Sequence, residues 1–204
     1  MVLPETKERQ ALWQVLLLSE GSNKKKKGSM KIAGVIAAKG HSKRFEGKNL
    51  YPVDGIPMFQ HSVRAMQESM YPIDIHVCTD SQRIASLCDE SVNIIWRGEA
   101  ISEDEQPLFD VIKHARNTIS ERYDIYVVPL ANTINLTGQD IDAAIRLLKK
   151  KGLWEVRGYG TDGQENGLLV LADIAFLKHE ISSYVGAIVT PAKEIHYEDE
   201  IKKV

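Results

Sequence analysis

The hydrophobic pattern from residue 31 onward alternates between short apolar runs and segments with a helical period. Residues 31–37 read KIAGVIA, a continuous apolar run of the kind found in strands that are buried on both faces. A stripe of apolar residues from Leu108 to Ile119 has spacings of 3, 1, 3 and 4, which predicts an amphipathic helix at 107–119. The same criteria predict strands at 73–78, 92–96, 124–129, 167–172 and 185–190, and helices at 57–70, 81–88 and 139–151. This alternation predicts an α/β protein with a Rossmann-like, doubly wound and mostly parallel sheet.

The first 29 residues are a different kind of sequence. Residues 4–20 begin with a proline, contain an apolar stripe and are followed by a glycine, which predicts a helix. Residues 24–27 are four consecutive lysines, a self-repelling run typical of a solvated linker. We therefore divide the chain into 1–29 and a folded domain at 30–204. The first part is either a leader or tag before a native start at Met30, or a fused helix that docks on a partner or an anionic surface.

Composition restricts the partners of the folded domain. Apolar residues make up 43% of the chain and charged residues 26%, which is the range of globular proteins. The 26 basic and 28 acidic residues give a net charge of −2, so the basic excess expected for binding to nucleic acid is absent. Apolar runs fall well short of the ~18 residues of a membrane span, and no membrane partner is expected. Cys78 and Cys88 form no CxxC motif, which favours a reduced, cytoplasmic chain.

The candidate chemistry lies in the segment that follows the first predicted strand. Residues 39–48 contain Gly40 and Gly47 together with four cations, Lys39, Lys43, Arg44 and Lys48. In a doubly wound sheet ligands bind beyond the carboxyl ends of the strands, and cations beside exposed amides suit a polyphosphate. The segment contains neither the GxxxxGK[ST] motif nor GxGxxG. The alternative interpretation is a solvated basic surface loop.

This loop resembles the signature of the acylneuraminate cytidylyltransferases, the family that makes CMP-sialic acid and its relatives. The family pattern is A-R-G-G-S-K-x-x-x-G-K-N, and residues 38–49 read AKGHSKRFEGKN. The resemblance implies a nucleotide-diphospho-sugar transferase fold and a loop that wraps the triphosphate of CTP. It implies catalytic roles for Lys39 and Lys48, which would stabilise the charge of the leaving pyrophosphate. It also implies a nucleotide-binding set made of Ala38, Lys39, Gly40, Ser42, Lys43, Lys48, Asn49, Asp80 and Asn132.

Other segments extend the resemblance over most of 30–204. They include NLYPVDGIPMFQ at 49–60, CTDS at 78–81, the Ala-Asn pair at 131–132 and the Asn-Gly pair at 166–167. For two of the residues in the nucleotide-binding set, the sequence leaves two alternative roles open. Asp80 either ligates a metal or caps the next helix, and Asn132 either contacts the base or ribose or closes a turn.

Three departures from the family pattern matter for function. The arginine that follows the Ala-Asn pair in the family is absent from residues 133–137. The two family aspartates that hold the divalent metal fall on His196 and Glu198, so we expect Mg²⁺ to be held by Glu198 and Asp199, because Mg²⁺ prefers carboxylate oxygens. Between Gly152 and Asn166 the chain is short where the family carries a long insertion that contributes sugar and dimer contacts.

The resemblance therefore implies a CTP-dependent nucleotidyltransferase that uses Mg²⁺. CTP and a sialic-like 2-keto sugar acid would give a CMP-sugar and pyrophosphate, and a homodimer is a further expectation. Two alternatives remain. One is a nucleotidyltransferase for another sugar or a polyol, favoured by the short middle segment. The other is a non-catalytic nucleotide-binding protein, favoured by the missing arginine and metal aspartates.

Overall fold

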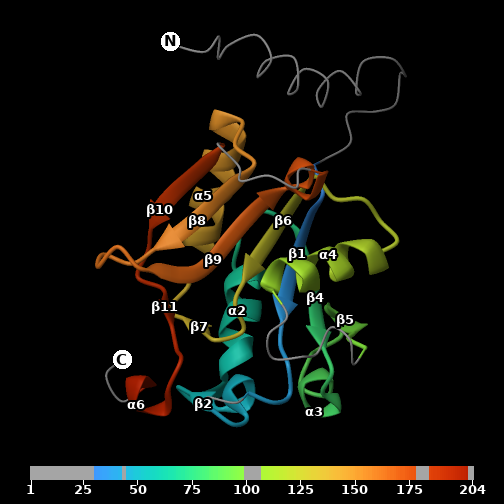
Figure 1. The fold of residues 1–204 in the computed structure, drawn as a ribbon, viewed down its shortest axis with the longest axis vertical. Coiled ribbons are helices and arrows are strands. Elements are labelled where there is room, and N and C mark those ends of the chain that lie inside the picture. The colour runs from blue at the N-terminus through green and yellow to red at the C-terminus, as the bar shows by residue number, and fades with distance from the viewer. Residues whose placement is uncertain (1–29, 43–44, 99–106, 178–183, 202–204) are drawn as a thin grey trace.

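A central seven-stranded sheet organises the protein (Figure 1). The structure, a computed structural model, describes residues 30–42, 45–98, 107–177 and 184–201. The helix and the leader predicted within 1–29 lie outside these residues. From one edge to the other, the strands are β10 (Val185–Val189), β8 (Glu155–Tyr159), β9 (Glu165–Ala172), β6 (Ile125–Pro129), β1 (Ile32–Ala37), β4 (Ile73–Thr79) and β5 (Val92–Trp96).

The sheet is mostly parallel, which confirms the predicted fold class. β1 pairs in parallel with β4 and β6, β4 with β5, and β8 with β10. β9 is antiparallel to both of its neighbours, β6 and β8. The carboxyl ends of the parallel strands therefore meet at one edge of the sheet, together with the amino end of β9.

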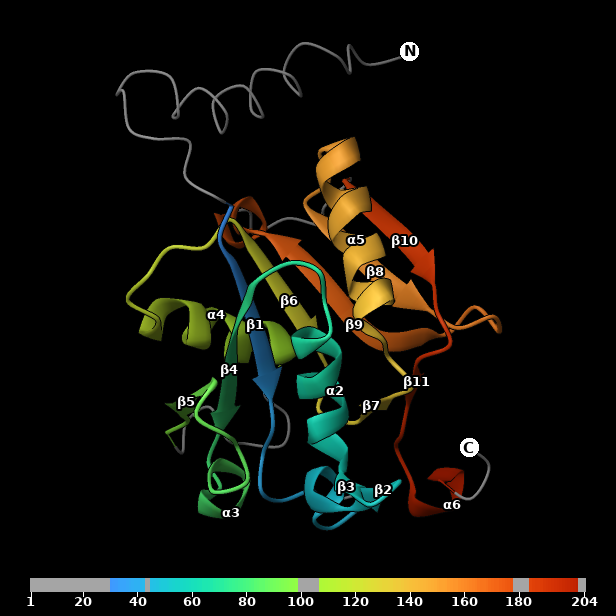
Figure 2. The ribbon, with the colours of Figure 1, turned by 180° about the vertical axis from the view of Figure 1, so that it is seen from behind.

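Helices cover both faces of the sheet. α4 (Leu108–Thr118) lies in front of it in Figure 1, and α2 (Met58–Gln67) and α5 (Gly138–Lys151) lie on the opposite face, which Figure 2 shows. The apolar run of β1 alternates between these layers. Ile32 and Ile36 enter the core cluster with α2 and α5, whereas Ala33 and Val35 enter the cluster with α4. A strand that faces two cores has no polar side, which explains the unbroken apolar run.

Two predicted helices are shorter than expected. The helix predicted at 57–70 ends at Gln67, because the Ser69 hydroxyl bonds the Asp142 carboxylate at 2.6 Å and draws the chain toward α5. The helix predicted at 81–88 is a single turn, α3 (Gln82–Ala85). The amides of Leu87 and Cys88 bond carbonyls three residues back, so tighter turns replace the α-helical pattern there.

Short elements that the pattern did not predict complete the fold. β8 belongs to the main sheet. Two further pairs of strands lie beyond the carboxyl edge of that sheet. These pairs are β2 (Pro52–Val53) with β3 (Ile56–Pro57), and β7 (Thr133–Ile134) with β11 (Lys193–Glu194). The remaining pieces are the 3₁₀ turns η1 (Lys48–Leu50) and η3 (Asp173–Leu177) and the short α6 (Glu198–Ile201). In the described ranges, no helix has the length and apolar character needed to cross a bilayer.

Candidate active site

The predicted phosphate loop begins where β1 ends, at the carboxyl edge of the sheet. The Ala38 amide still continues the ladder, since it donates to the carbonyl of Cys78 at 3.0 Å, and the Ala38 side chain is buried in the core. Ala38 thus anchors the loop to the sheet, and Gly40 and Ser42 lie beyond the last ladder bond. Lys43, which belongs to the predicted set, lies outside the described residues.

The start of the loop rests on the turn that follows β4. The Gly40 amide donates to Oδ1 of Asp80 at 2.7 Å. A side chain at position 40 would place its Cβ only 2.9 Å from the Cβ of Ser81, so glycine is needed there for close packing. Ser81, rather than Asp80, caps α3, because its hydroxyl accepts the Ile84 amide. Of the two roles predicted for Asp80, the capping role is therefore wrong.

The end of the loop is tied to its start. Asn49 is 6% exposed, and its Nδ2 donates to the carbonyl of Lys39 at 2.8 Å. Gly47 has φ of 65°, a left-handed conformation that glycine adopts without strain, and it leads into η1, where Lys48 lies. Asn49 thereby fixes the backbone of Lys39 close to the turn that carries Lys48, and the two predicted catalytic lysines flank a closed loop.

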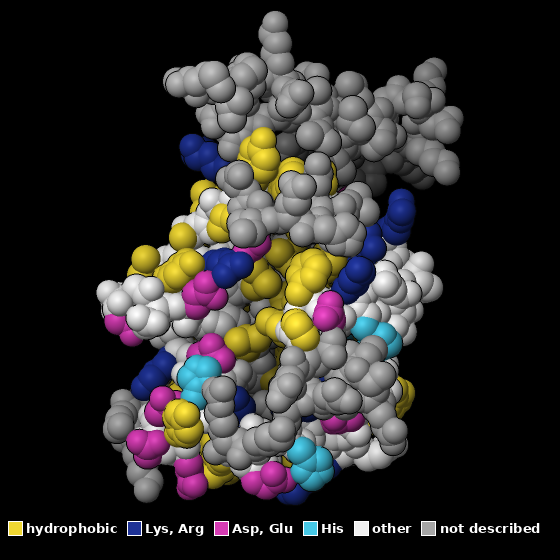
Figure 3. All heavy atoms as spheres, in the orientation of Figure 1, with side chains coloured by type: hydrophobic (Ala, Val, Ile, Leu, Met, Phe, Trp, Pro, Cys, Tyr) yellow, Lys and Arg dark blue, Asp and Glu magenta, His cyan; other side chains and the backbone are white. Residues whose placement is uncertain are grey.

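The C-terminal segment packs against this loop. The side chains of Phe45, Tyr51 and Ile201 contact a small buried cluster that includes Ile195. The Tyr51 hydroxyl donates to Oε1 of Glu198 at 3.3 Å, and the negative charge of Glu198 raises the pKa of Tyr51. α6 therefore places Glu198 beside the end of the phosphate loop, although the two residues are 147 positions apart. Figure 3 shows acidic side chains gathered over this part of the molecule.

The predicted metal residues are two adjacent carboxylates. Glu198 and Asp199 both belong to α6. Among the described residues, no group of three or more His, Cys, Asp or Glu side chains is arranged to hold a metal ion. Mg²⁺ commonly keeps several water ligands and is held by one or two carboxylates together with substrate phosphates. Two carboxylates next to a phosphate loop fit this mode of binding, and the Mg²⁺ assignment stays a prediction.

Asn132 joins the two short strands beyond the sheet. Its Nδ2 donates to the carbonyl of Ile195 at 2.7 Å and to Oε1 of Glu194 at 3.1 Å, and its carbonyl accepts the Ile195 amide. The side chain is 6% exposed. These contacts fit the structural interpretation, in which Asn132 closes a turn. Its contact with a nucleotide stays a prediction.

A large open cavity lies next to this segment, beyond the carboxyl ends of β8 and β10. Its volume is about 620 Å³. Four carboxylates, those of Asp162, Glu165, Glu194 and Glu200, line it together with Lys193 and His196. Sequence reasoning missed the four carboxylates. Glu194 and Glu200 lie close to His196 and Glu198, where the family pattern places its metal aspartates, and this was a usable signal, whereas Asp162 and Glu165 precede the predicted strand at 167–172 and had none. Burial raises the pKa of Glu200, but the amides of His196 and Tyr197 bond its carboxylate, and the net effect is a lowered pKa.

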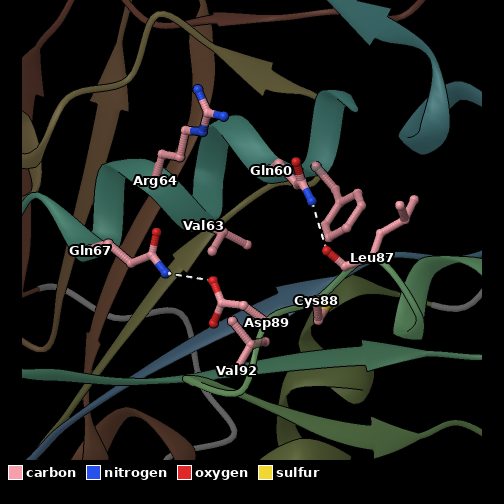
Figure 4. A pocket seen from close by; sticks show the side chains of 9 residues that line it. Gln60, Val63, Arg64, Gln67, Leu87, Cys88, Asp89 and Val92 are labelled. Atoms are coloured by element: carbon pink, nitrogen blue, oxygen red, sulfur yellow. Dashed lines mark hydrogen bonds between the residues drawn. The ribbon is translucent and has the colours of Figure 1, made fainter. Parts of the chain in front are cut away.

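A second cavity of about 140 Å³ lies between α2 and the segment that follows α3 (Figure 4). Gln60 bonds the carbonyl of Leu87 across it at 2.8 Å, and Gln67 bonds Asp89 at 3.3 Å. Its lining contains no residue of the phosphate loop. The larger cavity contains no described loop residue either, but Glu200 of α6 lines it and Glu198 of the same helix contacts Tyr51 at the end of the loop. We place the candidate active site at the carboxyl edge, where the phosphate loop, α6 and the larger cavity lie.

The fold is that of the nucleotide-diphospho-sugar transferases, and similar solved structures share it. The structure of CMP:2-keto-3-deoxy-manno-octonic acid synthetase complexed with CTP matches with a TM-score of 0.66 and 12% identity, over 85% of this chain and 96% of that one. The structure of Rv0371c from Mycobacterium tuberculosis matches with a TM-score of 0.67 and 12% identity, over 86% and 98%. The sequence model of the cytidylyltransferase family matches residues 33–202, and the chain belongs to that family.

Curated relatives come from more than one branch of the family. The 3-deoxy-manno-octulosonate cytidylyltransferase of Desulfosudis oleivorans is 44% identical over 55 residues, which is 27% of this chain and 22% of that protein. The N-acylneuraminate cytidylyltransferase of Streptococcus agalactiae is 32% identical over 87 residues, or 41% and 21%. The CMP-N,N'-diacetyllegionaminic acid synthase of Legionella pneumophila is 32% identical over 85 residues, or 41% and 37%. These matches span well under two thirds of each relative, and they do not single out the sialic acid branch.

Proposed function

We propose that the protein transfers the cytidylyl group of CTP to a hydroxyl of a 2-keto sugar acid, forming a CMP-sugar and pyrophosphate. The observation that carries this proposal is the phosphate loop after β1, closed by the bond from Asn49 to the Lys39 carbonyl and flanked by Lys39 and Lys48. Membership of the cytidylyltransferase family supports CTP as the nucleotide. The names of the relatives, which include octulosonate, neuraminate and legionaminic acid enzymes, support a sugar acid acceptor.

The reaction needs positioning and charge compensation more than covalent chemistry from the protein. The acceptor oxygen attacks the α-phosphorus and loses its proton, the bond from that phosphorus to the bridging oxygen breaks, and pyrophosphate leaves. Lys39 and Lys48 would neutralise the triphosphate and the charge that develops on pyrophosphate. The bond from Asn49 to the Lys39 carbonyl would keep the backbone of Lys39 next to the turn that carries Lys48 before the substrate arrives.

Glu198 and Asp199 would hold Mg²⁺ together with phosphate oxygens, and the ion would supply further positive charge at the triphosphate. The chain's own contribution is the position of α6. The contact between Tyr51 and Glu198 and the packing of Ile201 near Phe45 keep this acidic turn at the end of the loop. Asn49, Tyr51 and Ile195 would thus connect the phosphate-binding and metal-binding parts.

A second acceptor class is favoured by the charge of the large cavity. If the acceptor binds there, four carboxylates and one lysine surround it. Such a lining repels the carboxylate of a sugar acid and accepts hydroxyl groups, which favours a neutral sugar or a polyol. The same nucleotide chemistry would then act on a different acceptor.

The test measures nucleotide binding first and turnover second. Thermal unfolding with CTP, UTP, ATP and GTP, each with and without Mg²⁺, should give a rise specific to CTP. A ligand at 100 times its Kd stabilises by about 2.7 kcal/mol, and at about 2–4 °C per kcal/mol the midpoint should rise by about 5–10 °C. Pyrophosphate release is then measured with sugar acids and with neutral polyols as acceptors.

The outcomes separate the candidates. Release with a 2-keto sugar acid supports the proposal, and release only with a neutral acceptor supports the second acceptor class. Binding of CTP without turnover on any acceptor would support a non-catalytic nucleotide-binding protein. The absence of a shift with any nucleotide would contradict all three.

A further inference from the structure

We propose that Asp80 is a positioning residue of the phosphate loop. Its carboxylate holds the Gly40 amide, fixes the start of the loop and keeps the phosphates away from that amide. This inference rests on the proposed function, because it concerns how the same loop binds a nucleotide. It assigns Asp80 a role other than ligand to nucleotide or metal.

The contact continues the pairing of two strands with a side chain. β1 and β4 pair up to Ala37 and Cys78, and the Ala38 amide makes one further ladder bond to the Cys78 carbonyl at 3.0 Å. Two residues further on, the Gly40 amide bonds Oδ1 of Asp80 at 2.7 Å. A carboxylate is a stronger acceptor than a carbonyl, and bonds to ionised groups are roughly twice as strong as neutral ones. The loop is therefore held at the point where the ladder ends.

The close packing around Gly40 makes the bond between the Gly40 amide and Asp80 possible. A Cβ at position 40 would lie 2.9 Å from the Cβ of Ser81 and 3.5 Å from Oδ1 of Asp80. Only the absence of a side chain lets the amide come this close to the turn. The glycine at 40 is thus explained by a contact within the protein, whereas Gly47 is explained by its left-handed backbone.

The turn that carries Asp80 is fixed without help from the loop. Thr79 is fully buried, its hydroxyl accepts the Ser81 amide at 3.1 Å, and its carbonyl accepts the Arg97 amide at 2.9 Å. Ser81 in turn caps α3. The sheet and α3 therefore set the position of the backbone that carries Asp80, and its carboxylate connects the loop to that backbone.

The charge of Asp80 also excludes one place for the phosphates. Anions bind where backbone amides and cations converge. At Gly40 the amide is already occupied and a negative charge lies beside it, so a phosphate there would meet repulsion. The phosphates are therefore kept away from the Gly40 amide, and Lys48, at the other end of the loop, is a cation that would attract them. Asp80 thus contributes to affinity through the backbone that it holds, although its own charge has the wrong sign for a phosphate ligand.

The experiment compares Asp80→Asn and Asp80→Ala in the full chain. Asparagine retains an acceptor oxygen without the charge, whereas alanine removes both. Hydrogen exchange of the Gly40 amide is measured by NMR without nucleotide, and CTP affinity, KM and kcat are measured separately. Asp54→Asn is the control, since Asp54 lies in the exposed turn between β2 and β3 and its replacement removes one charge of the same sign.

We expect Asp80→Ala to speed exchange of the Gly40 amide roughly tenfold or more, and to raise KM for CTP by a similar factor with kcat within about threefold. Asp80→Asn should restore KM to within about threefold of the wild type, and Asp54→Asn should change neither exchange nor KM. CTP affinity in Asp80→Ala that equals or exceeds that of the wild type would overturn the proposal. So would a loss in Asp80→Asn as large as in Asp80→Ala, which would show that the charge itself acts on the ligand.

A pair of glycine variants tests the packing independently. Gly40→Ala should weaken CTP binding, and Gly40→Ala combined with Ser81→Gly should recover part of it, because the Cβ that the alanine meets is gone. Ser81→Gly alone is the control, because it removes the cap of α3. Normal CTP binding by Ser81→Gly with no recovery in the double variant would contradict the packing argument. If the wild type bound no nucleotide while Asp80→Ala still accelerated exchange at Gly40, the proposed function would fail and the structural contact would remain.

Discussion

Replacing Asn49 tests whether the closure of the phosphate loop matters for both stability and binding. The side chain is 6% exposed, and its Nδ2 donates to the Lys39 carbonyl at 2.8 Å. Asn49→Leu keeps a similar volume but removes the donor, and the carbonyl loses its partner. Loss of this bond at the part-buried Lys39 carbonyl should cost at most the penalty for an unpaired buried acceptor, about 1–3 kcal/mol. At about 2–4 °C per kcal/mol for a chain of this size, the unfolding midpoint should fall by about 2–12 °C.

The same loss should appear in nucleotide binding, because an open loop must be closed again when CTP binds. If the whole cost is transferred to binding, CTP affinity falls by about 5- to 150-fold, since 1.4 kcal/mol corresponds to a factor of ten. Thermal unfolding and isothermal titration with CTP measure the two effects. Asn93→Leu is the control, because Asn93 also donates to a backbone carbonyl, that of Ile75 at 3.3 Å, but lies on β5 away from the loop. An Asn49→Leu variant with unchanged midpoint and unchanged affinity would refute the closure argument.

Three further predictions concern the lysines, the helix caps and the cysteines. Lys48→Ala should lower kcat/KM by about 10²–10³-fold with little change in the unfolding midpoint, since removing one preorganised donor to a developing negative charge costs about this much in other enzymes; full pyrophosphate release would remove Lys48 from the site. Thr137→Ala breaks the capping box with Asp140 at the start of α5 and should cost about 0.5–2 kcal/mol in thermal unfolding, with KM for CTP unchanged. Burial raises the pKa of Cys78 to about 11, so its thiol holds its proton at neutral pH. A thiol reagent followed by mass spectrometry should therefore label the half-buried Cys88 first, and faster labelling of Cys78 would contradict the buried position of β4.

The elements that the sequence predicted are those whose pattern is local. The apolar run of β1 and the stripe of α4 depend only on neighbouring residues, and both elements lie within a residue of the predicted bounds. β8 was missed because its inward face carries Gly158, where the Asn166 side chain fills the space that a Cβ would need. A glycine in that position looks like a turn in the sequence, and only the partner strand explains it.

The candidate site also has a part that was visible in the sequence and a part that was not. The loop at 39–49 was visible in the sequence because its glycines, cations and asparagine lie together. The contacts that hold it were not, since Gly40 meets Asp80 across 40 positions and Tyr51 meets Glu198 across 147. Nothing in the local sequence of Asp80 distinguishes an acceptor for a distant amide from a helix cap or a metal ligand. Such a role is visible only when the two segments are brought together.

The reversed direction of β9 has a consequence for how this architecture changes over evolution. β9 separates β6, β1, β4 and β5, whose edge carries the phosphate loop, from β8 and β10, whose edge carries the large cavity. Because β9 runs antiparallel to β8, the two are joined by a short hairpin turn at 160–164, directly at the cavity. Insertions or deletions in that hairpin alter the cavity wall and leave the pairing of β1 with β4 and β6 intact. If the proposed acceptor binds at this cavity, acceptor preference can diverge through changes in length at one turn, while the strands that carry the phosphate loop stay unchanged.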